Sequence, residues 1–243
     1  MFILPILLRS AFAVAVSFSL LLWLIKLVEF LGGLDFSQFG IYPRRLDGLP
    51  GILLAPFIHG SFAHLFANTA PIIVIGTMLL YGYPRSAKVL LPVVYLGGGS
   101  AVWLFARDAY HIGASGLTFG MLFFVFTVGA LRWERRAIAI SLVVFFLYGS
   151  MIWGVLPATP DVSFESHLSG ALIGIVLAFL LRYRDPESPR KQYGWEREAE
   201  TDDYEWPEYR KYKRGSQSIP IPVPGEQCAG ARRYGGPRGA NPG

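Results

Sequence analysis

Apolar side chains are concentrated in six long stretches of the chain, and polar loops separate them. A helix needs roughly 20 apolar residues to cross the hydrocarbon core of a bilayer, and each stretch has about that length. The stretches lie at about 10–31, 62–81, 89–106, 115–131, 137–156 and 165–182. The pattern predicts an all-α membrane protein with a bundle of six transmembrane helices.

The composition agrees with this fold class. Hydrophobic residues make up 53% of the 243 residues and charged residues only 16%, which is typical of a multi-span membrane protein. The chain has one cysteine, Cys228, so it can form no intramolecular disulfide and no zinc site made of thiolates.

The last quarter of the chain has a different character. Residues 184–243 carry eight prolines and many charges without apolar periodicity. Such a segment cannot bury a core, so we expect a disordered tail. The predicted organisation is a six-span domain at 1–183 followed by this tail at 184–243.

Basic residues predict the orientation of the spans. If the spans alternate in direction, one side of the membrane receives most of the loop arginines and lysines, which are Arg9, Arg85, Lys88, Arg132, Arg135, Arg136, Arg182 and Arg184. The positive-inside rule then places both termini in the cytoplasm. Arg44 and Arg45 are the exception. They belong to a long first loop, 32–61, whose mixed apolar and proline-rich sequence predicts a segment in the membrane interface.

Few polar side chains lie within the spans, and those that do are candidates for function. His64 and Asn68 lie near the start of the second span, Ser115 begins the fourth, and His167 is near the start of the sixth. Since alternate spans run in the same direction, all four groups are expected near the external face. His64 and Asn68 are four residues apart and therefore face the same way on a helix.

Small residues predict that the fourth and sixth spans pack closely. Gly116 and Gly120 repeat the four-residue spacing of Gly170 and Gly174, and such faces let helix backbones approach in lipid. If the two faces meet, Ser115 and His167 come within hydrogen-bond reach. Ser115 also lies at a helix N-terminus, where free N–H groups can stabilise negative charge.

Other polar residues have alternative interpretations. His59, His64 and His167 could in principle surround a zinc ion, although no Asp, Glu or Cys within the spans lies near them, except Glu165 at a boundary. His111 could be a rival base, but its loop position favours a surface histidine. Lys26 and Glu29, three residues apart, are expected to pair near the interface.

Three motifs in order resemble the rhomboid intramembrane serine proteases. They are His59-Gly-Ser-Phe-Ala-His64-Leu-Phe-Ala-Asn68, Gly113-Ala-Ser115-Gly116 and Glu165-Ser-His167-Leu-Ser-Gly170. The resemblance covers residues 10–182. It implies that Ser115 is the nucleophile and His167 its general base, and that His64 and Asn68 stabilise the oxyanion. His59 is expected to be structural or peripheral. Many members have Gly or Ala at the position of Ser166.

The resemblance also implies a function. We expect a serine endopeptidase of the cell membrane that cleaves single-pass membrane proteins near the outer face, without cofactor or metal. The fifth span, with Phe145, Phe146 and Trp153, is expected to gate access. One alternative is a non-catalytic rhomboid-like protein that binds membrane proteins. Another is a transporter, which would need polar groups through the whole membrane depth, whereas here they cluster in the outer third.

Overall fold

The computed structural model describes residues 3–158 and 162–187, and the elements in these ranges are helical. A single isolated bridge, between Ile41 and His111, is the only β-type pairing within these residues. The helices are α1 (Ile3–Leu31), η1 (Ser37–Phe39), η2 (Leu46–Gly48), α2 (Gly51–Leu54), η3 (Ala55–Phe57), α3 (Phe62–Gly82), α4 (Pro84–Phe105), α5 (Ser115–Leu131), α6 (Arg135–Tyr148), η4 (Gly149–Val155) and α7 (Phe164–Leu181).

The prediction of a helical membrane bundle is confirmed. Among the described residues, five helical segments are long and apolar enough to cross a bilayer, namely those built on α1, α3, α4, α6 with η4, and α7. The predicted fourth span coincides with α5, which is apolar but has only 17 residues. A crossing by α5 therefore stays a prediction.

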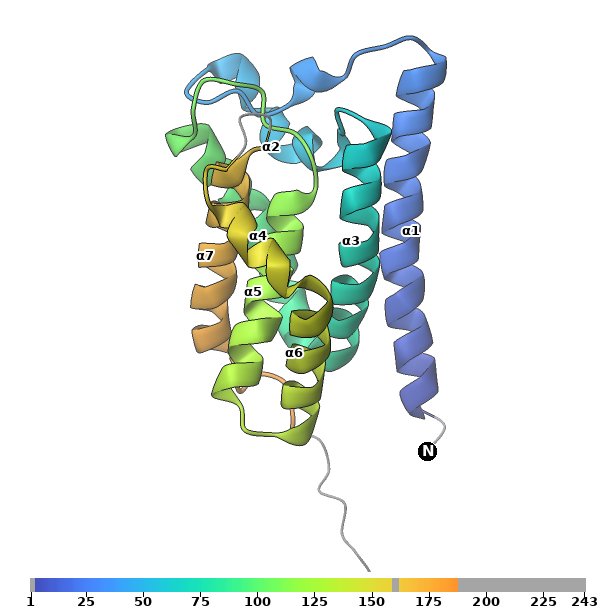
Figure 1. Cartoon of the computed structure of the whole chain (residues 1–243), viewed down its shortest axis with the longest axis vertical. Helices are drawn as coiled ribbons and strands as arrows, with labels where there is room; N and C mark the ends of the chain where they lie inside the picture. Colours follow the sequence, from blue (N-terminus) through green and yellow to red (C-terminus); the bar gives the residue numbers. More distant parts are fainter. Residues whose placement is uncertain (1–2, 159–161, 188–243) are drawn as a thin grey trace, which may run out of the picture. The chain divides into compact units, whose positions relative to one another are not determined.

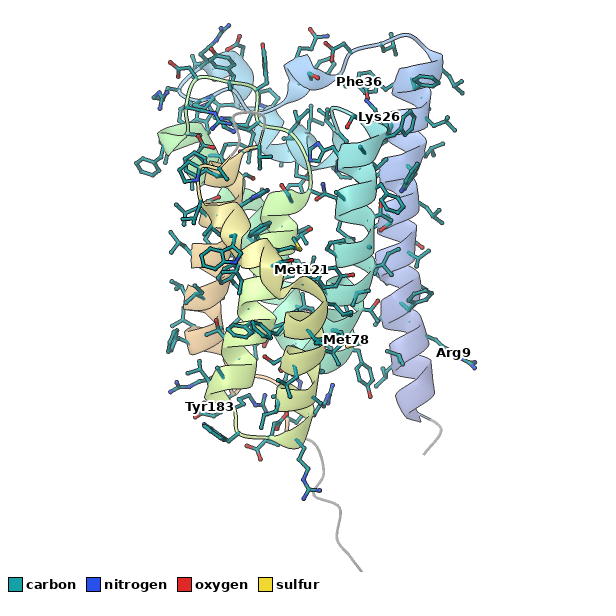
Figure 2. All side chains as sticks on the ribbon, in the orientation of Figure 1. Arg9, Lys26, Phe36, Met78, Met121 and Tyr183 are labelled. Carbon is teal, nitrogen blue, oxygen red and sulfur yellow. The ribbon has the colours of Figure 1, made fainter. Side chains whose placement is uncertain are left out.

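Three elements differ from their predicted bounds. Helix α4 begins at Pro84 rather than near residue 89, so Arg85 and Lys88 lie in its first turns instead of in a loop. The first helix begins at Ile3 rather than near residue 10, so Arg9 lies within α1, and Figure 2 shows its side chain pointing away from the bundle. A long basic side chain can reach the interface from inside a span, which explains why Arg9 does not end the helix. The predicted span 137–156 is an α-helix only to Tyr148 and continues as the 3₁₀ helix η4. Gly149 and Gly154 favour this change because glycine is a poor α-helix former.

Helix α5 lies at the centre of the bundle (Figure 1) and packs against α3, α4, α6 and α7. Its strongly apolar surface fits this place, because a helix that is hydrophobic all round is buried. Phe124, Val125 and Val128 of α5 are fully buried in the main core cluster. Helix α1 packs on α3 at the side of the bundle.

The first loop is folded and closes one end of the bundle. Glu29 near the end of α1 pairs with Lys26 at 2.9 Å, as expected, and also accepts the backbone N–H of Phe36 at 3.0 Å. Figure 2 shows Lys26 and Phe36 at this end. Gly48 and Gly51 lie so close to the backbone of Tyr42 and Gly40 that a Cβ at either position would clash. The loop is thus held by backbone contacts.

Arg85 and Arg132 lie at the opposite end of the bundle, and an aspartate after α7 joins them. Asp185 is 3% exposed. Its carboxylate accepts hydrogen bonds from the backbone N–H groups of Arg85 and Ser86, at 2.8 and 3.0 Å, and from the Ser86 hydroxyl at 2.6 Å. Arg132 donates to the Asp185 carbonyl at 3.0 Å. The packed chain therefore continues two residues past the predicted boundary at 183. The rest of the predicted tail, from residue 188, lies outside the described residues.

Replacing Asp185 with alanine is expected to lower the free energy of unfolding by about 1–3 kcal/mol, because the donors at the start of α4 lose their acceptor inside the protein. The matched control is Glu187→Ala, which removes an exposed carboxylate two residues later. Thermal denaturation in detergent micelles measures both variants. Equal midpoints for the two variants would contradict the capping role of Asp185.

Candidate active site

Ser115 is the first residue of α5, and a tight turn precedes it. Gly113 has φ of +107°, a conformation that side chains other than glycine rarely adopt. Its N–H donates to the carbonyl of Ala55 in the first loop at 2.8 Å. A Cβ at Gly113 would lie 2.9 Å from Nε2 of His64, so glycine also leaves room for that ring. The turn that leads into Ser115 therefore contacts both the first loop and His64.

His167 makes two hydrogen bonds at this site. Its Nε2 lies 2.8 Å from the Ser115 hydroxyl, and its Nδ1 lies 2.8 Å from the carbonyl oxygen of Gly154 in η4. The ring is 9% exposed and stacks on Phe119 of α5, with 4.0 Å between centroids and 5° between planes. The expectation that Ser115 and His167 come within hydrogen-bond reach is confirmed.

The contact between α5 and α7 has the basis expected from the glycine spacing. A Cβ at Gly170 would lie 2.0 Å from the carbonyl oxygen of Gly116. A Cβ at Gly174 would lie 2.3 Å from the carbonyl oxygen of Gly120. Only glycine allows the two backbones to approach this closely, and the approach places the histidine of α7 beside the serine of α5.

The two predicted oxyanion residues lie on α3 in different surroundings. His64 is half-buried, and its ring tip faces the Gly113 turn. Asn68 is buried, and its side-chain amide donates to the carbonyl of His64, one helical turn earlier, at 3.0 Å. This bond uses one of the two amide N–H groups of Asn68. The structure therefore brings His64 to the serine turn, whereas the hydrogen bond of Asn68 is internal to α3.

The prediction that His111 is a surface histidine is wrong. Its side chain is 3% exposed and bonds to the Ser163 hydroxyl at 2.6 Å and the Arg107 carbonyl at 3.0 Å. The ring is covered because the backbone of His111 pairs with Ile41 of the first loop. His111 contacts Ser163, the N-cap of α7, instead of Ser115. It ties the loop before α5 to the start of α7.

His59 is buried too, at 1% exposure, with its ring centroid 5.0 Å from that of His64. It therefore lies inside the protein, which favours the structural one of its two expected roles. Within residues 3–158 and 162–187, no three His, Cys, Asp or Glu side chains are grouped as ligands of a metal ion would be. The aromatic residues expected to gate access, Phe145, Phe146 and Trp153, are all exposed on α6 and η4.

Two features of the site were missed from the sequence. Phe119 lies four residues after Ser115, so helical periodicity places both on one face of α5 and could have identified it. Gly154 contributes a backbone carbonyl. No residue type marks such a contribution, because every residue has one, and only the fold shows which carbonyl meets His167.

The burial of His59 predicts that the stability of the protein depends on pH. Burial lowers the pKa of His59 from its usual 6.5 to about 4, and the nearby His64 acts in the same direction. Between these two values the unfolded chain binds a proton that the folded chain does not, so stability falls as the pH falls through this range. Thermal midpoints measured from pH 7.5 to 4 should therefore decline less in His59→Phe than in the parent. Parallel declines in the two proteins would show that His59 does not contribute to the pH dependence of stability.

Comparison with known proteins gives one family match and several relatives. The profile of the Rhomboid domain matches residues 48–184. An uncharacterised protein of Mycobacterium tuberculosis is 38% identical over 175 residues, which cover 68% of this chain and 72% of the relative. One from Mycobacterium leprae is 36% identical over 196 residues, covering 76% and 75%. RHOMBOID-like protein 2 of Arabidopsis thaliana is 29% identical over 150 residues, covering 60% and 44%.

The profile match covers more than half of the chain and includes Ser115, His167, His64 and Asn68. The match supports a function of the intramembrane protease type in general terms. Together, the apolar helices and the profile match indicate a multi-pass membrane protein. The chain belongs to the rhomboid family.

Proposed function

We propose that this chain is an active intramembrane serine endopeptidase in which Ser115 is the nucleophile and His167 the general base. The observation that carries the proposal is the 2.8 Å hydrogen bond between the Ser115 hydroxyl and Nε2 of His167. A serine hydroxyl is a weak nucleophile until an adjacent base removes its proton, and this contact supplies that base. The same contact lies within the region that matches the Rhomboid domain.

The reaction follows from these two groups. The Ser115 oxygen attacks the carbonyl carbon of the scissile peptide while Nε2 of His167 takes the hydroxyl proton. His167 then gives this proton to the leaving amine, and an acyl-serine remains. A water molecule, deprotonated by the same nitrogen, attacks the acyl-serine and releases the carboxylate product. The serine regains its proton from His167, so the cycle needs no cofactor or metal.

Three kinds of donor can stabilise the oxyanion of each tetrahedral intermediate. The first N–H groups of α5 have no acceptor within the helix, and they begin at Ser115. The His64 ring lies at the adjacent Gly113 turn. Asn68 of α3 has a second amide N–H beyond the one bonded to His64. Donors fixed before the reaction contribute most in a site that excludes water.

The substrates we propose are single-pass membrane proteins cut near the outer face. Ser115 begins α5 and His167 is in the first turns of α7, at the end of the bundle opposite the basic residues around Asp185. If those basic residues mark the cytoplasmic side, the site faces outward and both termini are cytoplasmic. A substrate helix must unwind locally to present its peptide bond to Ser115.

The proposed orientation predicts how Cys228, the one cysteine of the chain, reacts. In intact bacterial cells that express the protein, a membrane-impermeant maleimide should leave Cys228 unlabelled. Permeabilising the inner membrane should allow labelling, and a Cys228→Ser variant gives the background. Labelling in intact cells would place the C-terminus outside and reverse the proposed topology.

The test of the function is cleavage of reporters by the purified protein in proteoliposomes. The reporters are single-pass proteins with small residues near one or the other membrane face, and a parallel sample contains EDTA. We expect cleavage of reporters with small residues near the outer face, unaffected by EDTA. Binding of reporters without cleavage of any of them would favour the alternative, a non-catalytic rhomboid-like protein that binds membrane proteins.

A further inference from the structure

We infer that the backbone carbonyl of Gly154 fixes the protonation pattern of His167 and thereby makes Gly154 a positioning residue of the proposed dyad. A carbonyl oxygen only accepts hydrogen bonds, so Nδ1 of His167, 2.8 Å away, must carry the proton. In a neutral imidazole the other nitrogen then has a free lone pair. That nitrogen, Nε2, faces the Ser115 hydroxyl at 2.8 Å. The inference rests on the proposed function for its catalytic consequence.

The carbonyl occupies the place of the carboxylate in a serine protease triad. In the triad, an aspartate bonded to Nδ1 holds the histidine in the correct tautomer. Here the acidic residue nearest in sequence to His167 is Glu165. Its carboxylate lies 3.7 Å from the Arg107 guanidinium and accepts a hydrogen bond from the Arg107 backbone N–H. A neutral carbonyl sets the tautomer and the ring orientation, although it stabilises a charged imidazolium less than a carboxylate does.

The surroundings of Gly154 require a glycine. A Cβ at this position would lie 2.8 Å from the Phe119 ring and 3.4 Å from Nδ1 of His167. The Phe119 ring cannot move away freely, because it stacks face to face on His167 at 4.0 Å. The imidazole is therefore held by three groups: the ring of Phe119 on one face, Gly154 at Nδ1 and Ser115 at Nε2.

The carbonyl comes from η4, which directly continues α6. Neither Ser115 nor His167 belongs to this segment, so the protonation pattern of the base depends on where a third part of the chain lies. Trp153, the neighbour of Gly154, is 70% exposed, which puts the segment at the surface of the bundle. Any substrate that displaces η4 removes the acceptor at Nδ1, so η4 must be in place when the serine attacks.

Histidine ¹⁵N chemical shifts, which distinguish protonated from unprotonated ring nitrogens, test the inference. The protein contains only four histidines, and the signals of His167 are assigned by their loss in His167→Gln. In the Ser115→Ala variant, where the serine no longer donates to Nε2, we expect Nδ1 to stay protonated because Gly154 still accepts. A mixture of tautomers in Ser115→Ala would overturn the inference, because it would show that Ser115 alone sets the pattern.

The second variant is Gly154→Ala, with Gly149→Ala of the same 3₁₀ helix as its control. The three atoms nearest to a Cβ at Gly149 all belong to the Phe145 side chain, the closest at 3.1 Å. We expect Gly154→Ala to produce mixed tautomers and to slow reporter cleavage about 10- to 100-fold, the range for a small misplacement of catalytic groups. Unchanged shifts in a folded Gly154→Ala protein would overturn the inference. The shifts need no turnover, so failure to cleave any reporter refutes the proposed function alone.

Discussion

Replacing Ser115 with alanine is expected to reduce cleavage of a single-pass reporter by about 10³-fold or more, and His167→Ala should cause a loss of similar size. The first variant removes the attacking oxygen, and the second removes the base that lies 2.8 Å from it. Because the two side chains act as one unit, the double variant should be little worse than either single variant. Product formation in proteoliposomes measures all three.

Ser166→Ala is the matched control for these losses. Ser166 directly precedes His167 on α7, and its hydroxyl faces Gly116 of α5. Within residues 3–158 and 162–187, the Ser115 hydroxyl and the His167 ring bond to each other and to the Gly154 carbonyl, and not to Ser166. Its replacement should leave the cleavage rate within about twofold of the parent, because Ser115 and His167 keep their positions relative to each other. If Ser115→Ala still cleaves at the rate of Ser166→Ala, the assignment of the nucleophile is wrong.

The second large effect is expected at Gly170. Its replacement by alanine places a methyl group 2.0 Å from the backbone oxygen of Gly116, so α7 must move away from α5. Overpacking of this kind costs about 1–3 kcal/mol or more in a well-packed core. Even a shift of about 1 Å between Ser115 and His167 would slow catalysis about 100-fold. We therefore expect a lower thermal midpoint together with nearly complete loss of cleavage.

Gly98→Ala separates this effect from a general cost of removing membrane glycines. Gly98 is buried in α4 and faces α7, but a Cβ there would lie 3.8 Å from the Ser169 hydroxyl, an ordinary contact. This variant should keep its stability and activity. Equal losses in Gly98→Ala and Gly170→Ala would show that the close contact of α5 with α7 has no special role.

The apolar pattern predicted the helices well because each long apolar stretch has one way to satisfy its backbone in lipid. The predicted second and fourth spans, 62–81 and 115–131, match α3 and α5 to within one residue. The pattern did not predict that α1 begins at Ile3, before Arg9. An arginine at a membrane interface is compatible with a helix on either side of it. The pattern also could not distinguish the 3₁₀ helix η4 from an α-helix.

For the site, the spacing of residues within a helix was informative, because it shows which side chains share one face of that helix. The glycine pairs on α5 and α7 indicated the contact that brings His167 to Ser115. Contacts made across loops were not predictable. His111 was expected at the surface because the sequence does not show that Ile41 of the first loop pairs with it. The carbonyl of Gly154 was missed for the same reason, because tertiary structure alone decides which backbone group meets a side chain.

The central claim is that His167 activates Ser115, and covalent labelling by a fluorophosphonate probe tests it most directly. Such a probe reacts with a serine whose hydroxyl is activated by a base, without any need to know the natural substrate. The account predicts that mass spectrometry finds the adduct on Ser115 in the parent and in Ser166→Ala, and that His167→Ala loses it. Labelling of Ser115 that persists unchanged in His167→Ala, or an adduct on another serine in a protein that cleaves reporters, would contradict the account.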